Sequence, residues 1–212
     1  MVAMPKITPP RCYTPEEYFE IDERAEERLE YVDGEILAMA GTSLGHNKVA
    51  GNIYLNLRLL FRGRSCEVFM ESIRVRVSET RYRYPDIVAL CGAAQVAETR
   101  PPTLLNPMVI FEVLSPSTKN KDVGEKFDEY AQNDTMTDYI LVAQDTMRVR
   151  HYRRLNENDW QVSSYTKAED IVRLESLNVS LTLADIYNEI TFPKQLTLLK
   201  ERTTRKTVRK KP

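Results

Sequence analysis

The pattern of apolar and polar residues along the chain predicts helices and strands in mixed order. Apolar side chains recur at helical spacing from His46 to Phe61 and again from Asp122 to Asn133. An earlier helix is predicted to begin at Thr14-Pro15, an N-cap followed by a proline at the first helical position. Alternation between Ile73 and Ser78 predicts a half-buried strand with its arginines outward, and Asp33-Gly34 predicts a tight hairpin.

One predicted strand contains a residue that does not suit its surroundings. Residues 108–114 form a short apolar run near prolines, which predicts a strand buried on both faces, yet the run includes Glu112. Desolvating an unpaired carboxylate costs several kcal/mol, whereas a whole domain is stable by only about 5–15 kcal/mol. We therefore expect a cation beside Glu112, either the side chain of an ordinary buried ion pair or a bound metal.

The preceding strand repeats this pattern. Asp86 follows Pro85 and stands at the head of an apolar run that ends at Leu90. Two central strands with one acid each suit a metal-dependent hydrolytic site, because Mg²⁺ binds few carboxylates and leaves room for water and substrate phosphate. Lys126 lies at the edge of the inner face of the next helix, so it can reach back toward the end of the Glu112 strand.

Three further residues have both a structural and a functional interpretation. Glu35 begins the second hairpin strand, where it is either an exposed hairpin-end residue or a third acid of the site. His46 begins the apolar stripe of a helix, where it is either a buried structural histidine or a contact to the substrate. Ser43 matches the G-x-S-x-G pattern of serine hydrolases, but the strand before it belongs to an antiparallel hairpin, so a helix cap is the preferred interpretation.

The rest of the chain predicts more strands, at 139–143, 149–155 and 160–165, and a short helix from residue 184. The densely charged segment 22–30 predicts a solvated helix face without chemistry. We expect an α/β domain at residues 14–190, a loose lead-in at residues 1–13 and a basic, disordered tail at residues 191–212.

Composition narrows the function classes. The 212 residues are 42% hydrophobic and 29% charged, which is typical of a soluble globular protein. The net charge is −1, but seven Lys/Arg and one Glu from residue 200 onward give +6, so residues 1–199 carry −7. The domain itself is therefore not a basic nucleic-acid binder.

Three cysteines without a C-x-x-C pair, an odd count, predict a reducing compartment, with no disulfide framework and no zinc site. We expect a cytoplasmic protein with no membrane association, because neither a signal peptide nor an apolar run of membrane-spanning length is visible.

Several segments together resemble a known family. Glu35, Pro85-Asp86, the string from Phe111 to Thr118 and the segment Gly124 to Phe127 are similar to the restriction endonuclease domain family of bacteria. That family belongs to the PD-(D/E)XK, or restriction-endonuclease-like, nuclease superfamily. The resemblance covers about residues 14–190 and implies an α/β restriction-endonuclease-like core, with a mixed central β-sheet flanked by helices and extra antiparallel strands.

The resemblance also implies a function, a metal-dependent endonuclease that hydrolyses phosphodiester bonds in nucleic acid, with DNA as the expected substrate. Asp86, Glu112 and Glu35 would then be catalytic acids that bind Mg²⁺, or Mn²⁺, and Lys126 would be catalytic. The family's motif lysine would lie two residues after Glu112, where this chain has Leu114, and the resemblance moves that role to Lys126.

Ser115 and His46 are candidate substrate contacts, and a homodimer would suit cleavage of both strands. The main alternative is a catalytically silent module of the same fold that binds nucleic acid or a protein partner, and a serine hydrolase using Ser43 is a weaker one.

Overall fold

The computed structural model describes residues 11–39, 41–114 and 124–192. Ser115, the tail beyond residue 192 and most of the predicted lead-in lie outside these residues. In chain order, the elements are α1 (Pro15–Arg24), β1 (Leu29–Val32), β2 (Glu35–Ala38), α2 (Leu44–Leu60), β3 (Cys66–Met70), β4 (Arg74–Ser78), β5 (Arg81–Arg83), β6 (Ile87–Cys91), β7 (Val96–Ala97), β8 (Thr103–Leu104), β9 (Val109–Leu114), α4 (Glu125–Tyr130), β10 (Asp138–Ala143), β11 (Val149–Arg154), β12 (Trp160–Tyr165), β13 (Ile171–Leu174), the 3₁₀ turn η1 (Glu175–Leu177), β14 (Val179–Thr182) and α5 (Leu183–Ile186).

A six-stranded mixed sheet forms the centre, in the order β12-β11-β10-β9-β6-β3. β9 and β10 are parallel, while the other neighbours are antiparallel. A second six-stranded sheet has the order β2-β1-β5-β4-β8-β7, and β13 pairs with β14. The chain is thus a mixed α/β protein with extra antiparallel strands, as the sequence predicts.

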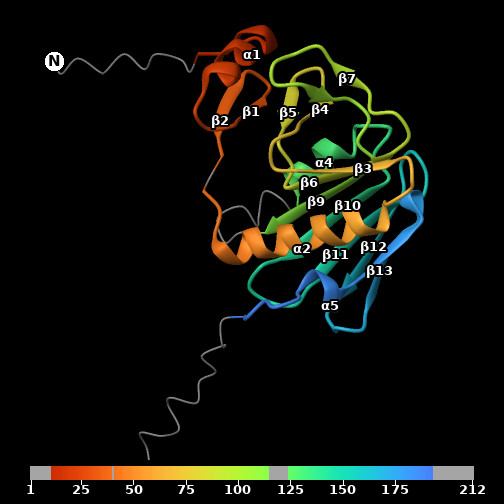
Figure 1. Ribbon diagram of the computed structural model, residues 1–212. Coiled ribbons are helices and arrows are strands. Elements are labelled where there is room, and N and C mark those ends of the chain that lie inside the picture. Colours follow the sequence, from red (N-terminus) through yellow and green to blue (C-terminus); the bar gives the residue numbers. More distant parts are fainter. Residues whose placement is uncertain (1–10, 40, 115–123, 193–212) are drawn as a thin grey trace, which may run out of the picture.

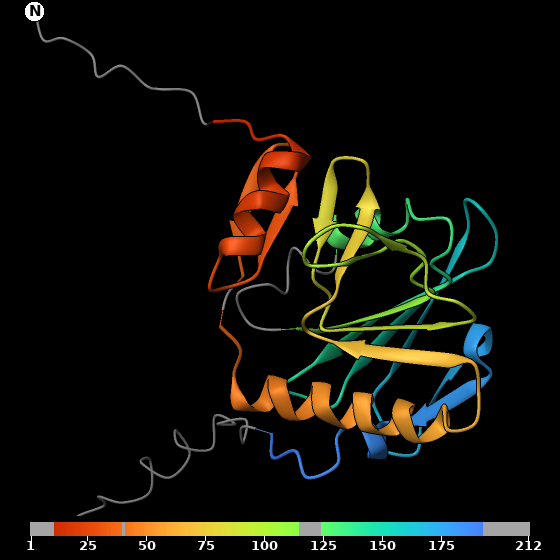
Figure 2. The same ribbon diagram turned by 45° about the horizontal axis from the view of Figure 1, so that its top comes forward.

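Different layers cover the two faces of the central sheet. On one face, α2 and α5 pack in a cluster that joins Val49 to Phe111 of β9. On the other face, Tyr130 of α4 and Ile110 of β9 share a second cluster with Val75 of β4. Figures 1 and 2 show α2 along one side of the sheet and α4 with β4 and β5 on the other. Neighbouring residues of β9 therefore point into two cores, which explains its continuous apolar sequence.

The charged segment near residues 22–30 does not form the predicted solvated helix face. α1 ends at Arg24, and Asp22 is fully buried, with Oδ2 2.9 Å from Nη1 of Arg74. Arg74 is also fully buried, although the alternation along β4 predicts that it points outward. Its guanidinium lies 4.5 Å from the ring centroid of Phe19, and its Nε donates to Thr103. Periodicity failed here because a second layer, α1, covers the face that a single sheet would expose to water.

The cysteines include one disulfide that their spacing did not predict. Cys66 and Cys91 are directly opposite each other on the antiparallel strands β3 and β6, and they form a disulfide. Cys12 is free and exposed. Spacing along the chain could not reveal a cross-strand pair, since it depends on the register of two strands. The inference of a reducing compartment from the cysteines loses that support. In the described part of the chain, no helix is long and apolar enough to cross a membrane.

The buried pair Asp22–Arg74 should be a major determinant of stability. We expect Arg74→Met to lower the free energy of unfolding by about 3–5 kcal/mol, because it leaves a desolvated carboxylate without its cation. The exposed pair Arg11–Glu17 offers a control, and Arg11→Ala should have a much smaller effect, because exposed ion pairs contribute little to stability. Urea unfolding of both variants measures the difference, and equal effects would contradict this account.

Candidate active site

Asp86 and Glu112 lie next to each other on neighbouring strands. The pairing of Ile87 with Phe111 places Asp86, the residue before β6, opposite Glu112 in the antiparallel ladder. The backbone N–H of Val113 donates to Oδ2 of Asp86 at 2.6 Å. The two acids that the sequence singles out are thus brought together at one end of the central sheet.

The carboxylate of Glu112 is buried and has a cation beside it. Glu112 is 4% exposed, and Nζ of Lys126 lies 3.1 Å from its Oε1. The hydroxyl of Tyr130 donates to the same oxygen at 3.3 Å. Lys126 and Tyr130 are four residues apart on α4, so one face of this short helix supplies both groups. Burial, and then the charge of Glu112, raise the pKa of Tyr130 well above 10.0, so its hydroxyl stays a neutral donor.

Asp86 has a different environment, in which two neighbouring groups contact the same carboxylate oxygen. Its Oδ2 accepts from Val113 and also lies 3.1 Å from Nε2 of His46, which is 5% exposed in the first turn of α2. Among the residues that the structure describes, none donates a hydrogen bond to Oδ1 of Asp86. Lys126 and Tyr130 both bond to Oε1 of Glu112. Asp86 keeps Oδ1 available for a ligand.

The N-terminal cap of α2 positions His46. Ser43 is the N-cap of α2, and its hydroxyl accepts from the backbone N–H of His46 at 3.1 Å. The side chain of Gln144, in the turn after β10, contacts the same hydroxyl. Ser43 therefore has the capping role that the sequence favours over a nucleophilic one, and Nε2 of His46 serves Asp86.

Glu35 lies in the second sheet and not on the central strands next to Asp86 and Glu112. Glu35 is an exposed residue at the start of β2, opposite Val32 in the second sheet. Across the described residues, no group of three or more His, Cys, Asp or Glu side chains is arranged to hold a metal ion. Ser115, the other predicted contact, lies outside the described part of the chain.

Glu71 is an acid near this site that the sequence did not single out. Its backbone N–H donates to the carbonyl of Asp86 at 2.9 Å, so it lies opposite Asp86 at the end of β3. Its φ of 58° is left-handed, an uncommon conformation for a glutamate. Its Oε1 is buried, and no described group bonds to it. The only sequence signal was an isolated acid after the apolar end of a strand.

A second buried network fixes the helix that carries Lys126. Arg83, at the end of β5, contacts Glu129 of α4 at 2.7 Å and Glu30 of β1 at 2.6 Å. Glu129 adjoins Tyr130, and Arg83 lies three residues before Asp86. The network therefore joins α4 to the chain that leads into Asp86. The sequence missed it because Glu30 was assigned to a solvated segment.

These residues fit a divalent metal of the Mg²⁺ type. Mg²⁺ is usually held by one or two carboxylates, with water and substrate phosphate completing its shell. Asp86, with Oδ1 open, and Glu112 would supply two such carboxylates from a rigid sheet. This donor set consists of oxygen alone, which favours Mg²⁺ or Mn²⁺ over zinc.

The fold is shared with a solved structure. A protein from Anabaena variabilis, described as a putative nuclease belonging to DUF820, superimposes with a TM-score of 0.67. The match covers 82% of this chain and 97% of that chain, at 17% sequence identity. The architecture is therefore that of an α/β protein with a nuclease-like fold.

Sequence comparison assigns the family. Residues 15–184 match the model of the Uma2 family, whose description is "Putative restriction endonuclease". The uncharacterized protein slr1290 of Synechocystis sp. is 32% identical over 193 residues, covering 91% of this chain and all of that protein. A second Synechocystis protein, sll1609, is 31% identical over 151 residues, covering 71% of this chain and 85% of that protein. The chain belongs to the Uma2 family.

The contact between Lys126 and Glu112 can be measured without any metal. In EDTA, we expect Lys126→Met to lower the free energy of unfolding by about 3 kcal/mol, below the upper end for fully buried pairs because Lys126 is 14% exposed. The double variant Lys126→Met/Glu112→Gln should recover much of that loss, since no buried charge is left unpaired. Urea unfolding of both single variants and the double variant gives the coupling energy. Additive losses would show that the two side chains do not interact.

Proposed function

We propose that this protein is a metal-dependent endonuclease that hydrolyses phosphodiester bonds in DNA. The observation that carries the proposal is the pair of acids on neighbouring central strands, Asp86 with an open oxygen and Glu112 beside Lys126. Membership of the Uma2 family supports nuclease activity as the chemistry of such a site. Mg²⁺ is the expected cofactor, and Mn²⁺ should replace it.

Each residue has a defined part in this proposal. Asp86 and Glu112 would hold the metal, which would supply Lewis-acid chemistry at the scissile phosphate and lower the pKa of a bound water. His46 orients Asp86 through the contact to Oδ2 and leaves Oδ1 directed to the ligand. Glu35 is left out of this set, because it is exposed in the second sheet.

Lys126 is assigned to the substrate. Its ammonium group is held within 3.1 Å of Glu112, so it can donate to a phosphate oxygen that approaches the same carboxylate. A positioned donor of this kind stabilises the charge that develops on the phosphoryl oxygens. Tyr130 keeps its proton and bonds to Glu112, so it restrains that carboxylate and does not act as a base.

Concerted cleavage of both DNA strands would need two such sites. We propose that a homodimer supplies them, with one site from each chain. A monomer would cut one strand at a time, so nicked circles would accumulate from a supercoiled plasmid before linear DNA appears.

A cleavage assay tests the proposal directly. Supercoiled plasmid, linear duplex, single-stranded DNA and RNA are incubated with the full chain and Mg²⁺, Mn²⁺ or EDTA. We expect cutting of duplex DNA with either metal and none in EDTA. Asp86→Asn and Glu112→Gln should reduce cleavage to background, and Lys126→Ala should reduce it by roughly 10²–10³-fold.

Glu67→Gln is a matched control, since Glu67 is an exposed acid on β3 of the same sheet, and it should cut like the wild type. Metal-independent cutting, or full activity of Glu112→Gln, would contradict the proposal. Binding of nucleic acid without cutting under any of these conditions would favour the catalytically silent module.

A further inference from the structure

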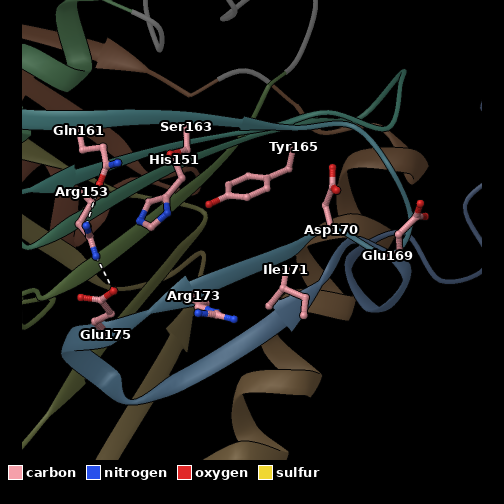
Figure 3. A pocket seen from close by; sticks show the side chains of 10 residues that line it. All are labelled: His151, Arg153, Gln161, Ser163, Tyr165, Glu169, Asp170, Ile171, Arg173 and Glu175. Atoms are coloured by element: carbon pink, nitrogen blue, oxygen red, sulfur yellow. Dashed lines mark hydrogen bonds and ion pairs between the residues drawn. The ribbon is translucent and has the colours of Figure 1, made fainter.

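The arginines of β11 and the turn before it fall into two groups. Arg153 contacts Glu175 at 2.5 Å and Gln161 at 2.7 Å, and Arg154 donates to the carbonyl of Met136 at 2.8 Å. These two side chains hold neighbouring elements together. Arg153 lines a pocket of about 460 Å³. Figure 3 shows Arg153 on the wall of this pocket, with its link to Glu175.

Arg150 and Arg148 lack such partners. The contact of Arg150 is with the hydroxyl of Tyr152, at 3.4 Å. In the described part of the chain, no carboxylate lies within ion-pair distance of Arg148 or Arg150. Arg150 is half-buried and Arg148 is exposed. The guanidinium of Arg150 has a planar fork of donors that suits a phosphate.

The register of the sheet places Arg150 in line with the acids. Glu112 pairs with Leu141 of β10, and Leu141 pairs with Arg150 of β11. Two strand spacings separate Glu112 from Arg150, so their Cα atoms lie about 10 Å apart. Both residues belong to the same row across the sheet, and residues of one row point to the same face.

That face is the one on which α4 lies. Tyr152, two residues after Arg150, packs against Phe127 of α4 with ring centroids 4.5 Å apart. Arg148 precedes Arg150 by two residues, and its carbonyl accepts from Ala143, so it lies opposite the end of β10. Strand alternation therefore directs Arg150 to the side that carries Lys126, whereas Arg153 points to the other. Arg148 lies in the turn just before β11, close to Arg150 along the chain.

We propose that Arg150, assisted by Arg148, binds a phosphate of the nucleic-acid backbone a few nucleotides from the scissile one. The proposal rests on the proposed nuclease function and adds the path of the substrate, across β9, β10 and β11. A separation of about 10 Å corresponds to roughly three nucleotides of duplex rise. Such a contact gives an acidic domain a local site for a polyanion.

The test measures binding separately from cutting. Fluorescence anisotropy follows a labelled DNA duplex titrated with the full chain at several KCl concentrations, with Ca²⁺ as the hard cation and gels to show that the duplex stays intact. We expect Arg150→Gln to weaken binding about tenfold and to lower the log–log salt slope by about 0.9, the value for one lost phosphate contact. Arg148→Gln/Arg150→Gln should lower it by about 1.8.

Two variants make the result specific. Arg153→Gln removes the same charge from the same strand on the opposite face, and its affinity and slope should match the wild type. Arg150→Lys keeps the charge without the fork, so it should keep the slope and lose part of the affinity. Thermal melts confirm that each variant is folded. In the Mg²⁺ assay, Arg150→Gln should raise KM more than it lowers kcat, because the contact is made in both ground and transition states.

The outcomes separate this inference from the proposed function. If the wild type binds and cuts DNA but Arg150→Gln has an unchanged slope, or Arg153→Gln loses as much, the assignment of Arg150 is wrong and the nuclease proposal stands. If the wild type shows the Arg150 dependence but never cuts, the phosphate contact stands and the endonuclease is rejected. A wild type that neither binds nor cuts overturns both.

Discussion

The burial of a carboxylate in the middle of a two-sided strand is the constraint on which the rest of the site depends. β9 can be apolar on both faces only because α2 covers one and α4 covers the other. Glu112 is tolerated there because α4 directs Lys126 and Tyr130 to one of its oxygens. A helix of only six residues is not stable alone, so its position must come from other contacts.

Those contacts are again buried charges. Arg83 joins Glu129 of α4 to Glu30 of β1, and Arg74 joins Asp22 of α1 to β4. Breaking such pairs is costly, whereas their net contribution relative to apolar residues is small. Their effect is to specify how the second sheet and α1 dock, and hence where the chain enters Asp86. The site therefore depends on the N-terminal elements, although none of them supplies a residue to it.

The sequence was informative where a local pattern dictates structure. The caps at Thr14 and Ser43, the Asp33-Gly34 hairpin and the two-sided burial of Glu112 follow from neighbouring residues alone, and the structure has them. The position of Lys126 beside Glu112 followed from helical spacing.

What the sequence could not reveal depends on register and on a second layer. Cys66 meets Cys91, and Glu71 meets Asp86, only because two strands pair in one alignment. Asp22 and Arg74 look solvated along the chain, and they are buried because α1 docks on the second sheet. Glu35 resembled a third acid by its place in the family pattern, and the hairpin places it in the second sheet, opposite Val32.

The central claim is that Asp86 and Glu112 form one metal site, and a calorimetric titration tests it most directly. Mn²⁺ is titrated into the wild type, Asp86→Asn, Glu112→Gln and the control Glu67→Gln, all without nucleic acid. We expect one binding event per chain in the wild type and the control, and its loss in both site variants, since each removes one of two carboxylates. Unchanged binding in Asp86→Asn and Glu112→Gln, or no binding by the wild type, would contradict the claim and leave Glu112 as half of an ordinary buried ion pair.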